Sequence, residues 1–217
     1  MESSTVKRAE ILSASPKMFE NRLLDALSRV HPVVPPLIFL PAITVALVMG
    51  LHRIGTGNVL IALVAGYVIW TLSEYWLHRI VFHFEPEKGI GARLHWIIHG
   101  VHHDHPNDPM RLVMPPSVSV PLTALFLLAF DAVFGFSWGI AIFSGFLAGY
   151  LAYDMLHYYT HHHRPKSGLG KRLRELHMRH HFQDDTTGYG IAAPYWDWVF
   201  RTKVDRARRA EPAPRED

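Results

Sequence analysis

The sequence contains no cysteine, which excludes disulfide bonds, thiolate zinc sites and iron–sulfur clusters. It also lacks a large excess of charge, because the formal net charge is only +3. A charge this small does not indicate nucleic-acid binding without a concentrated basic patch. No H-E-x-x-H motif occurs, which argues against an intramembrane metalloprotease. Residues 1–30 are polar and mixed in charge, and they do not have the pattern of a cleavable signal peptide.

Charged residues are also missing from four long apolar stretches, at 33–51, 54–73, 112–130 and 132–153. Each stretch is about 20 residues long, the length that a helix needs to cross a bilayer. The first two are joined only by His52 and Arg53, and the last two only by the residue Asp131. We therefore predict an all-α integral membrane protein with four transmembrane helices in two hairpins. The alternative is the helical core of a soluble protein.

The positively charged residues predict the orientation of these helices. An even number of spans places the N-terminus, the interval 74–111 and the C-terminal region on one side of the membrane. Arg53 is the only one of the 22 lysines and arginines on the other side. Basic residues favour the cytoplasmic side, so we expect the shared face to be cytoplasmic. We divide the chain into an N-terminal cytoplasmic segment (1–30), a membrane-embedded domain (31–203) and a polar, disordered tail (204–217).

Histidine is concentrated in two windows that follow the second and fourth predicted spans. All of the 16 histidines except His31 and His52 fall within residues 78–105 and 157–181. Both windows therefore begin on the cytoplasmic face at the same membrane depth, where we expect a helical cap. A basic C-terminal region there can also contact anionic lipid headgroups.

The spacing of these histidines predicts that their rings converge. The pattern H-x2-H-H occurs twice and H-x3-H once, and residues at i, i+3 and i+4 share one face of a helix. We therefore expect each such group to direct its rings into one volume. The H-x4-H pair does not fit one helical face, so one of its members is expected where a helix ends. The groups are His78 and His83; His99, His102 and His103; His157 and His161; and His177, His180 and His181.

Ten converging imidazoles make a poor structural core, because each ring has a donor and an acceptor to satisfy and protonated rings repel one another. A bound cation removes both problems, and imidazole suits iron, copper, nickel and zinc. Ten ligands are too many for one ion and suit two. We therefore predict a dinuclear metal site with five histidines from each half of the chain. The two halves form a faint internal repeat, since His78 and His157 are separated by nearly the same interval as His99 and His177.

Carboxylates and further histidines stand close to these groups. Metal-bound imidazoles usually donate their other N–H to a carboxylate or a carbonyl. Glu74 and Asp154 precede the first histidine of their halves by about one helical turn, and we expect them to support the metal ligands. The other histidines of the two windows are expected to be hydrogen-bonding or gating groups at most. These are His95, His105, His162 and His163.

The four histidine groups, in this order after two hairpins, resemble the fatty acid hydroxylase and sterol desaturase superfamily. Three stretches resemble more narrowly the fatty acid 2-hydroxylases that act on sphingolipid acyl chains, and the likeness extends from about residue 60 to residue 203. The element R-L-V-M-P-P is the most specific part. The stretches are EYWLHRIVFH (74–83), HGVHHDHPNDPMRLVMPP (99–116) and GYGIAAPYWDWVFRT (188–202).

This resemblance implies a membrane-bound, non-haem oxygenase with two iron ions held by the ten histidines. Zinc can replace iron on purification. The implied reaction uses O2 and two electrons to convert C–H into C–OH next to an acyl carbonyl. Fungal and animal members carry a cytochrome b5 domain, for which residues 1–30 are too short, so we expect a separate electron donor such as a cytochrome b5-like protein or a ferredoxin. The membrane would be the inner membrane of a bacterium or the endoplasmic reticulum of a eukaryote.

The site is expected at the ends of the spans, where an acyl chain stays in hydrocarbon while its polar head reaches the cytoplasmic loops. We expect residues 112–121 and 188–198 to cover the access path, with Tyr189, Tyr195 and Trp196 contacting the substrate. Two alternatives remain open at this point. One is a desaturase or a sterol or carotenoid hydroxylase with the same metal centre. The other is a membrane metal transporter or sensor, although transporters place their ligands near the bilayer midplane.

Overall fold

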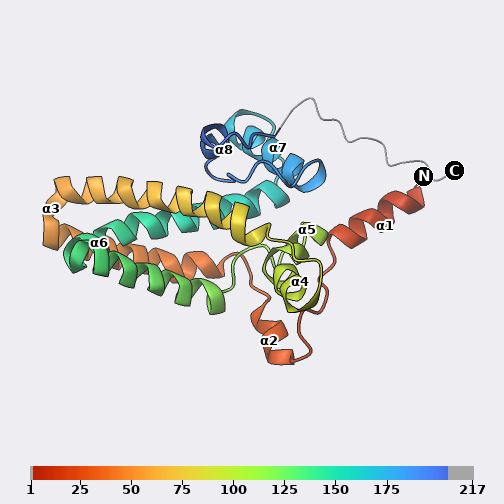
Figure 1. The fold of residues 1–217 in the computed structure, drawn as a ribbon, viewed down its shortest axis with the longest axis horizontal. Coiled ribbons are helices and arrows are strands. Elements are labelled where there is room, and N and C mark those ends of the chain that lie inside the picture. The colour runs from red at the N-terminus through yellow and green to blue at the C-terminus, as the bar shows by residue number, and fades with distance from the viewer. Residues whose placement is uncertain (1, 205–217) are drawn as a thin grey trace.

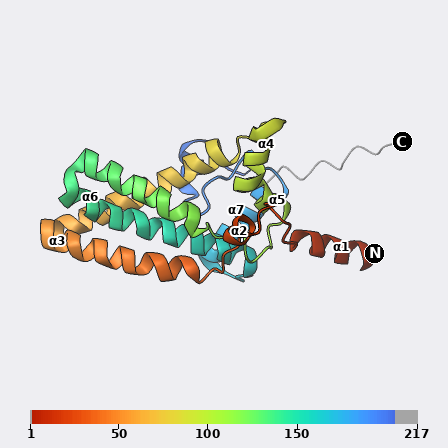
Figure 2. The same cartoon turned by 90° about the horizontal axis from the view of Figure 1, so that it is seen from below.

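The computed structural model describes residues 2–204, with side chains from Lys7 onward, and every regular element in this range is a helix. Two long helices, α3 (Val34–Trp76) and α6 (Pro116–His162), pack along each other and form the elongated part of the molecule (Figures 1 and 2). The shorter elements gather at one end of this pair and form a cap. The prediction of an all-helical protein is confirmed.

Each long helix is folded back on itself at a glycine. Gly55 has φ 76° and ψ 165°, and Gly135 has φ 71° and ψ 156°. Such positive φ values are readily adopted only by glycine. α3 therefore consists of arms 34–54 and 56–76, and α6 of arms 116–134 and 136–162. The expected connections at His52–Arg53 and Asp131 were placed a few residues too early, because apolar length locates a span but not the glycine at which it turns.

Both long helices are apolar enough to cross a membrane. The segments Val34–Phe82 and Pro116–His162 have mean hydropathies of 2.2 and 2.0 in their most apolar windows. Only 22% and 28% of those windows are buried inside the protein, so most of the apolar surface points outward. A soluble core helix would bury that surface, and the pattern is that of a membrane protein.

Small residues bring α3 and α6 into close contact. A Cβ atom added to Gly66 would collide with the carbonyl oxygen of Ile142, and one added to Gly145 would collide with that of Leu63. Close approach at small residues is the usual way in which membrane helices associate. Around this crossing lies an aromatic core in which Trp70 packs edge-on against Phe146, with ring centroids 5.2 Å apart. The arms are thereby held as one rigid scaffold beneath the cap.

The cap is built from short helices that continue or follow the two long ones. Directly after α3 comes the π-helix η1 (Leu77–Phe82), and α7 (Gly168–Phe182) follows α6. The remaining cap helices are α4 (Gly89–His95), the π-helix η2 (Trp96–Gly100), α5 (Val101–Asp104) and α8 (Tyr195–Val199).

The N-terminal segment contains α1 (Glu2–Leu12) and α2 (Arg22–Leu27) and is fastened to the cap. Buried Arg111 forms an ion pair with Asp25 at 3.1 Å and donates to the carbonyl of Pro16. The backbone N–H of Asn107 donates to the carbonyl of Leu12 at 2.9 Å. At the other end of the chain, Val204, the first residue of the predicted tail, is buried. The rest of that predicted tail, 205–217, lies outside the described residues.

Candidate metal centre

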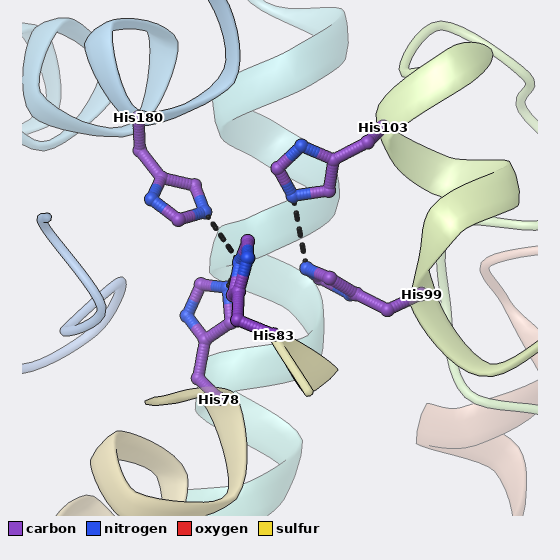
Figure 3. Close-up of side chains that lie close together, drawn as sticks. All are labelled: His78, His83, His99, His103 and His180. Carbon is purple, nitrogen blue, oxygen red and sulfur yellow. Dashed lines mark hydrogen bonds between the residues drawn. The ribbon is translucent and has the colours of Figure 1, made fainter. Parts of the chain in front are cut away.

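The ten histidines of the four groups form two clusters of five in the cap. The ligand atoms of each cluster lie within 4.8 Å of one another. Figure 3 shows the first cluster, with rings from η1, from the η2–α5 segment and from α7 pointing toward a common centre. Cluster 1 contains His78, His83, His99, His103 and His180, and cluster 2 contains His102, His157, His161, His177 and His181.

The two clusters exchange one histidine between the halves of the chain. Each H-x2-H-H group divides, because His102 joins cluster 2 while His99 and His103 stay in cluster 1. Likewise His180 joins cluster 1, while its neighbours His177 and His181 belong to cluster 2. The expectation that each H-x2-H-H group directs its rings into one volume was therefore wrong, although the ten clustered histidines do comprise five from each half of the chain. On a helix, positions i+3 and i+4 are rotated by about 100° from each other, so two nearby centres can separate them.

The pair His78 and His83 is aligned by a π-helix. The N–H of His83 donates to the carbonyl of His78 at 3.2 Å, which is the i→i+5 hydrogen bond of a π-helix. This wider turn brings two residues five positions apart onto one side, so that both rings reach cluster 1. His83 terminates η1, which confirms the expectation that one member of the pair lies where a helix ends.

The distances between ring nitrogens suit metal coordination. The Nε2 atoms of His161 and His177 are 2.8 Å apart, and those of His102 and His157 are 3.0 Å apart. Metal–nitrogen bonds of about 2.1 Å, at right angles or wider, separate neighbouring ligand nitrogens by about 3 Å or more. In addition, both ring nitrogens of His181 are buried without a hydrogen-bond partner. Buried polar atoms of this kind normally find partners, and a metal ion would supply one.

Burial keeps these rings neutral, which is the form that binds metals. Loss of solvent lowers the pKa of His180 to about 4 and that of His83 to about 4. Desolvation, together with neighbouring imidazoles, holds the pKa values of His99, His102 and His177 well below the usual range. The rings are therefore uncharged at neutral pH, and each keeps one N–H and one nitrogen lone pair that can bind a cation.

Backbone carbonyls orient two of the rings. His78 donates from Nδ1 to the carbonyl of Tyr189 at 2.7 Å, and His180 donates from Nδ1 to the carbonyl of Thr187 at 2.7 Å. Each bond directs Nε2 toward cluster 1. Buried Asp197 fixes this loop, because its carboxylate accepts the N–H groups of Tyr189 and Gly190, both at 2.9 Å. Sequence reasoning missed Asp197, whose only signal was its place inside the motif GYGIAAPYWDWVFRT.

Glu74 and Asp154 hold loops rather than histidine rings. Glu74 Oε1 accepts the N–H of Ala192 at 2.7 Å, and Asp154 Oδ1 accepts the N–H of Met114 at 3.1 Å. Neither carboxylate is hydrogen-bonded to a cluster histidine in the described part of the chain. Each acid therefore ties its own half to the loop that follows the H-x2-H-H group of the other half.

The three aromatic residues expected to contact the substrate pack within the cap. Tyr195 donates from its hydroxyl to Thr71 Oγ1 at 2.9 Å, and Trp196 donates from Nε1 to the same oxygen at 3.2 Å. Both thereby fasten α8 to α3. Tyr189 is buried against His78, with ring centroids 5.6 Å apart. Among the described residues that line the cavity below, none of these three is present.

The remaining histidines of the two windows lie at the edge of the clusters. His95 Nε2 is 3.7 Å from a carboxylate oxygen of Glu85, and the same oxygen is 3.6 Å from His83 Nδ1. His105 donates from Nδ1 to the carbonyl of Ile11 at 2.6 Å. His162 stacks on Tyr158 and His163 on Tyr159. The last three are thus placed by packing and by the N-terminal segment, outside both clusters.

A largely apolar cavity of about 500 Å³ reaches both clusters. It lies between the cap, the N-terminal segment and the ends of the long helices. His99 of cluster 1 and His102 and His157 of cluster 2 form part of its wall, as do Glu74 and Asp154. Residues 112–119 contribute to the lining, whereas 188–198 do not. Only the first of the two segments expected to cover the access path therefore borders the cavity.

The chain is similar to proteins of known activity along most of its length. A family profile described as fatty acid hydroxylase matches residues 63–202. Dihydroceramide fatty acyl 2-hydroxylase FAH2 of Arabidopsis thaliana is 39% identical over 193 residues, which cover 86% of this chain and 79% of that protein. The ceramide very long chain fatty acid hydroxylase SCS7 of Saccharomyces cerevisiae is 35% identical over 191 residues, covering 87% of this chain and 49% of the yeast protein.

A solved structure has the same fold. The structure of full-length scs7p, in which only the hydroxylase domain is visible, superimposes with a TM-score of 0.83 at 33% sequence identity. The match covers 89% of this chain and 74% of that chain. The chain thus spans about half the length of the yeast relative but most of the visible domain.

Proposed function

Because this chain belongs to the fatty acid hydroxylase family, we propose that it hydroxylates the acyl chain of a membrane lipid at the carbon next to the acyl carbonyl. It is an oxidoreductase, and ceramide-type lipids, which its relatives are named for, are the proposed substrates. The observation that carries this proposal is the pair of five-histidine clusters bordering one apolar cavity. An unactivated C–H bond offers no leaving group or acidic proton, so it requires redox chemistry rather than hydrolysis.

We propose that each cluster binds one iron ion. The all-nitrogen donor set, the separations near 3 Å between ring nitrogens and the unpartnered nitrogens of His181 support this assignment. Zinc can occupy the same ligands on purification, because it binds nitrogen sites at least as well as ferrous iron. When bound, the two ions supply the activation of O2. In the overall reaction R–H, O2, two electrons and two protons give R–OH and water.

The protein's own residues bring the substrate to the metals and keep water away. His99, His102 and His157 belong to the clusters and also line the cavity, so a substrate carbon there lies beside both centres. Apolar side chains such as Leu112, Val113 and Phe126 form much of the remaining wall. They bind hydrocarbon and exclude the bulk water that would compete at a reactive centre.

We propose that the four arms of α3 and α6 cross the membrane and that the cap lies on its cytoplasmic side. Each arm of about 20 residues rises about 30 Å, which matches the hydrocarbon core. The glycine bends lie at the end of the bundle remote from the cap, where Arg53 is the only lysine or arginine. The concentration of lysine and arginine at the cap end supports a cytoplasmic orientation. The two electrons would then come from a separate donor protein docking on this face.

Mass spectrometry of host lipids with and without the chain expressed tests the activity. We expect 2-hydroxylated acyl lipids to accumulate with the wild-type chain and to disappear with His180→Ala. The matched control is His52→Ala, which removes an exposed histidine remote from both clusters. Purified wild-type protein should contain two metal ions per chain. Unsaturated products in place of hydroxylated ones, or fewer than two ions bound by an active protein, would contradict the assignment.

A further inference from the structure

The cavity extends from the clusters into the bundle between the two arms of α6. At the cap end it is bordered by His157, near the end of the second arm, and by Val118, at the beginning of the first arm. Deeper in the bundle it is lined by Thr123 and Phe126 from the first arm and by Phe146 from the second. Because the arms are antiparallel, Phe126 and Phe146 lie at one level, away from the clusters. Thr123 lies about one helical turn closer to the clusters.

Two phenylalanines close the deep end. The rings of Phe126 and Phe146 have centroids 4.4 Å apart, and Phe146 is fully buried. Behind them Phe130 packs on Phe146 at 5.3 Å and on Phe126 at 6.2 Å. Phe130 is not among the residues that line the cavity. The cavity therefore ends at the Phe126–Phe146 pair. Because Phe130 packs behind both rings, they have little room to move away from an entering acyl chain.

The opposite end of the cavity is bordered by exposed apolar residues. Leu24 and Leu27 of α2, Ile98 of η2 and Val118 of α6 line the cavity and are each between 48% and 51% exposed. A mouth of this composition, next to the ends of membrane helices, faces hydrocarbon rather than water. A lipid tail can thus enter from the bilayer and extend past the clusters.

The depth of the cavity fits one lipid tail. Phe146 precedes His157 by three turns of α6, or about 16 Å along the helix axis. This is about half of the ~30 Å hydrocarbon core and so about the thickness of one leaflet. Hydroxylation next to the carbonyl fixes the head end of the acyl chain at the clusters. The position of the methyl end is then determined by chain length alone.

We infer that Phe126 and Phe146 limit how far the methyl end of the acyl chain can enter the cavity, and so set the longest chain that the protein hydroxylates efficiently. This inference rests on the proposed function. The acyl chain is selected by length only if the clusters hold its carbonyl end while Phe126 and Phe146 limit the position of its methyl end. A chain too long for the cavity must coil or withdraw its reacting carbon from the metals. A shorter one leaves apolar volume unfilled, which costs binding free energy for each missing methylene.

Substitutions at two levels of the cavity test this inference in opposite directions. Phe126→Ala makes the cavity deeper, and Thr123→Phe makes it shallower by about one helical turn. With a series of ceramides that differ only in saturated acyl length, we expect the preferred length to increase in Phe126→Ala and to decrease in Thr123→Phe. The ratio of kcat/KM between long and short substrates should change by about tenfold or more. The control is Phe143→Ala, which removes the same volume from the core but does not line the cavity.

Binding measured without turnover separates this inference from the proposed function. Displacement of a tritiated ceramide of intermediate length by the same series should show the same shifts. Unchanged length preference in folded Phe126→Ala and Thr123→Phe proteins overturns the inference even if hydroxylation is confirmed. Shifted binding without 2-hydroxylated product overturns the proposed function instead. Should Phe126→Ala fail to fold, Phe126→Leu makes the same test with a smaller loss of volume.

Discussion

The Nε2 atom of His180 lies 3.1 Å from the Nε2 atom of His83, although 97 positions separate the two residues in the sequence. His83 terminates the π-helix that follows α3, whereas His180 belongs to α7 (Figure 3). Cluster 1 is therefore a cross-link between the halves of the chain, and cluster 2 is one as well through His102. This relationship determines how the cap should respond to loss of metal.

Removal of metal should loosen the cap and spare the bundle. Under the proposed assignment, apo protein prepared with a strong chelator loses the metal–ligand bonds that join η1, η2, α5, α6 and α7. The glycine-mediated packing of the arms is unchanged. We expect the unfolding temperature to fall, because an ion bound only by the native state stabilises it. Hydrogen exchange should increase in 77–104 and 168–182 and stay the same in 34–70. Equal increases in both regions would contradict this division.

Replacement of Glu74 should distinguish its hydrogen bond from its charge. Glu74→Gln keeps an oxygen that can accept the N–H of Ala192, so folding and metal content should be retained. Glu74→Ala leaves that N–H without its partner and should cost about 1–3 kcal/mol. The loop 188–194 should then become more susceptible to proteolysis. If Gln and Ala destabilise the protein equally, the carboxylate charge is what matters.

A single methyl group at the helix crossing should be poorly tolerated. Gly66→Ala and Gly145→Ala each place a Cβ against a backbone carbonyl of the facing helix. The arms would have to separate, at a cost of about 1–3 kcal/mol or more. Thermal unfolding in detergent measures the loss. Gly57→Ala is the matched control, since its Cβ meets nothing within 4 Å. It should be neutral or slightly stabilising.

The ion pair between Arg111 and Asp25 should hold the N-terminal segment in place. Arg111 has a side chain only 3% exposed, and it joins the cap to both Asp25 and the carbonyl of Pro16. Arg111→Leu should therefore expose 13–30 to limited proteolysis and open the side of the cavity formed by Leu24 and Leu27. Lys17→Ala provides the comparison, because its pair with Glu20 is exposed and exposed pairs contribute little. Similar cleavage of both variants would argue against this role.

Much of the architecture follows from apolar length and from histidine spacing. Runs without charge predicted four arms, and the positions of the histidines after the second and fourth arms predicted two distant groups that meet. The turn positions were not predictable from hydropathy, because the bends depend on the positive φ of Gly55 and Gly135. The spacing H-x2-H-H led us to expect one volume for each group. The placement of α7 beside α5, where His103 stacks on His181, is what lets His102 and His180 cross over.

The supporting residues were harder to predict, because their partners are backbone atoms of loops distant in sequence. Glu74 and Asp154 were expected to support the metal ligands, yet they hold Ala192 and Met114 rather than histidines. Asp197 and Arg111 carry no spacing signal. Their importance comes from tertiary contacts with 188–190 and with the N-terminal segment.

The exchange of His102 and His180 also bears on how the protein is made. Cluster 1 requires His180, and cluster 2 requires His177 and His181, so neither can be complete until α7 has left the ribosome. The four arms, which we propose to cross the membrane, precede α7 and would enter the bilayer first, as earlier segments of a growing chain generally fold first. On the proposed assignment, metal binding is then a late event in biogenesis, and a chain released before α7 would be permanently unable to complete either cluster.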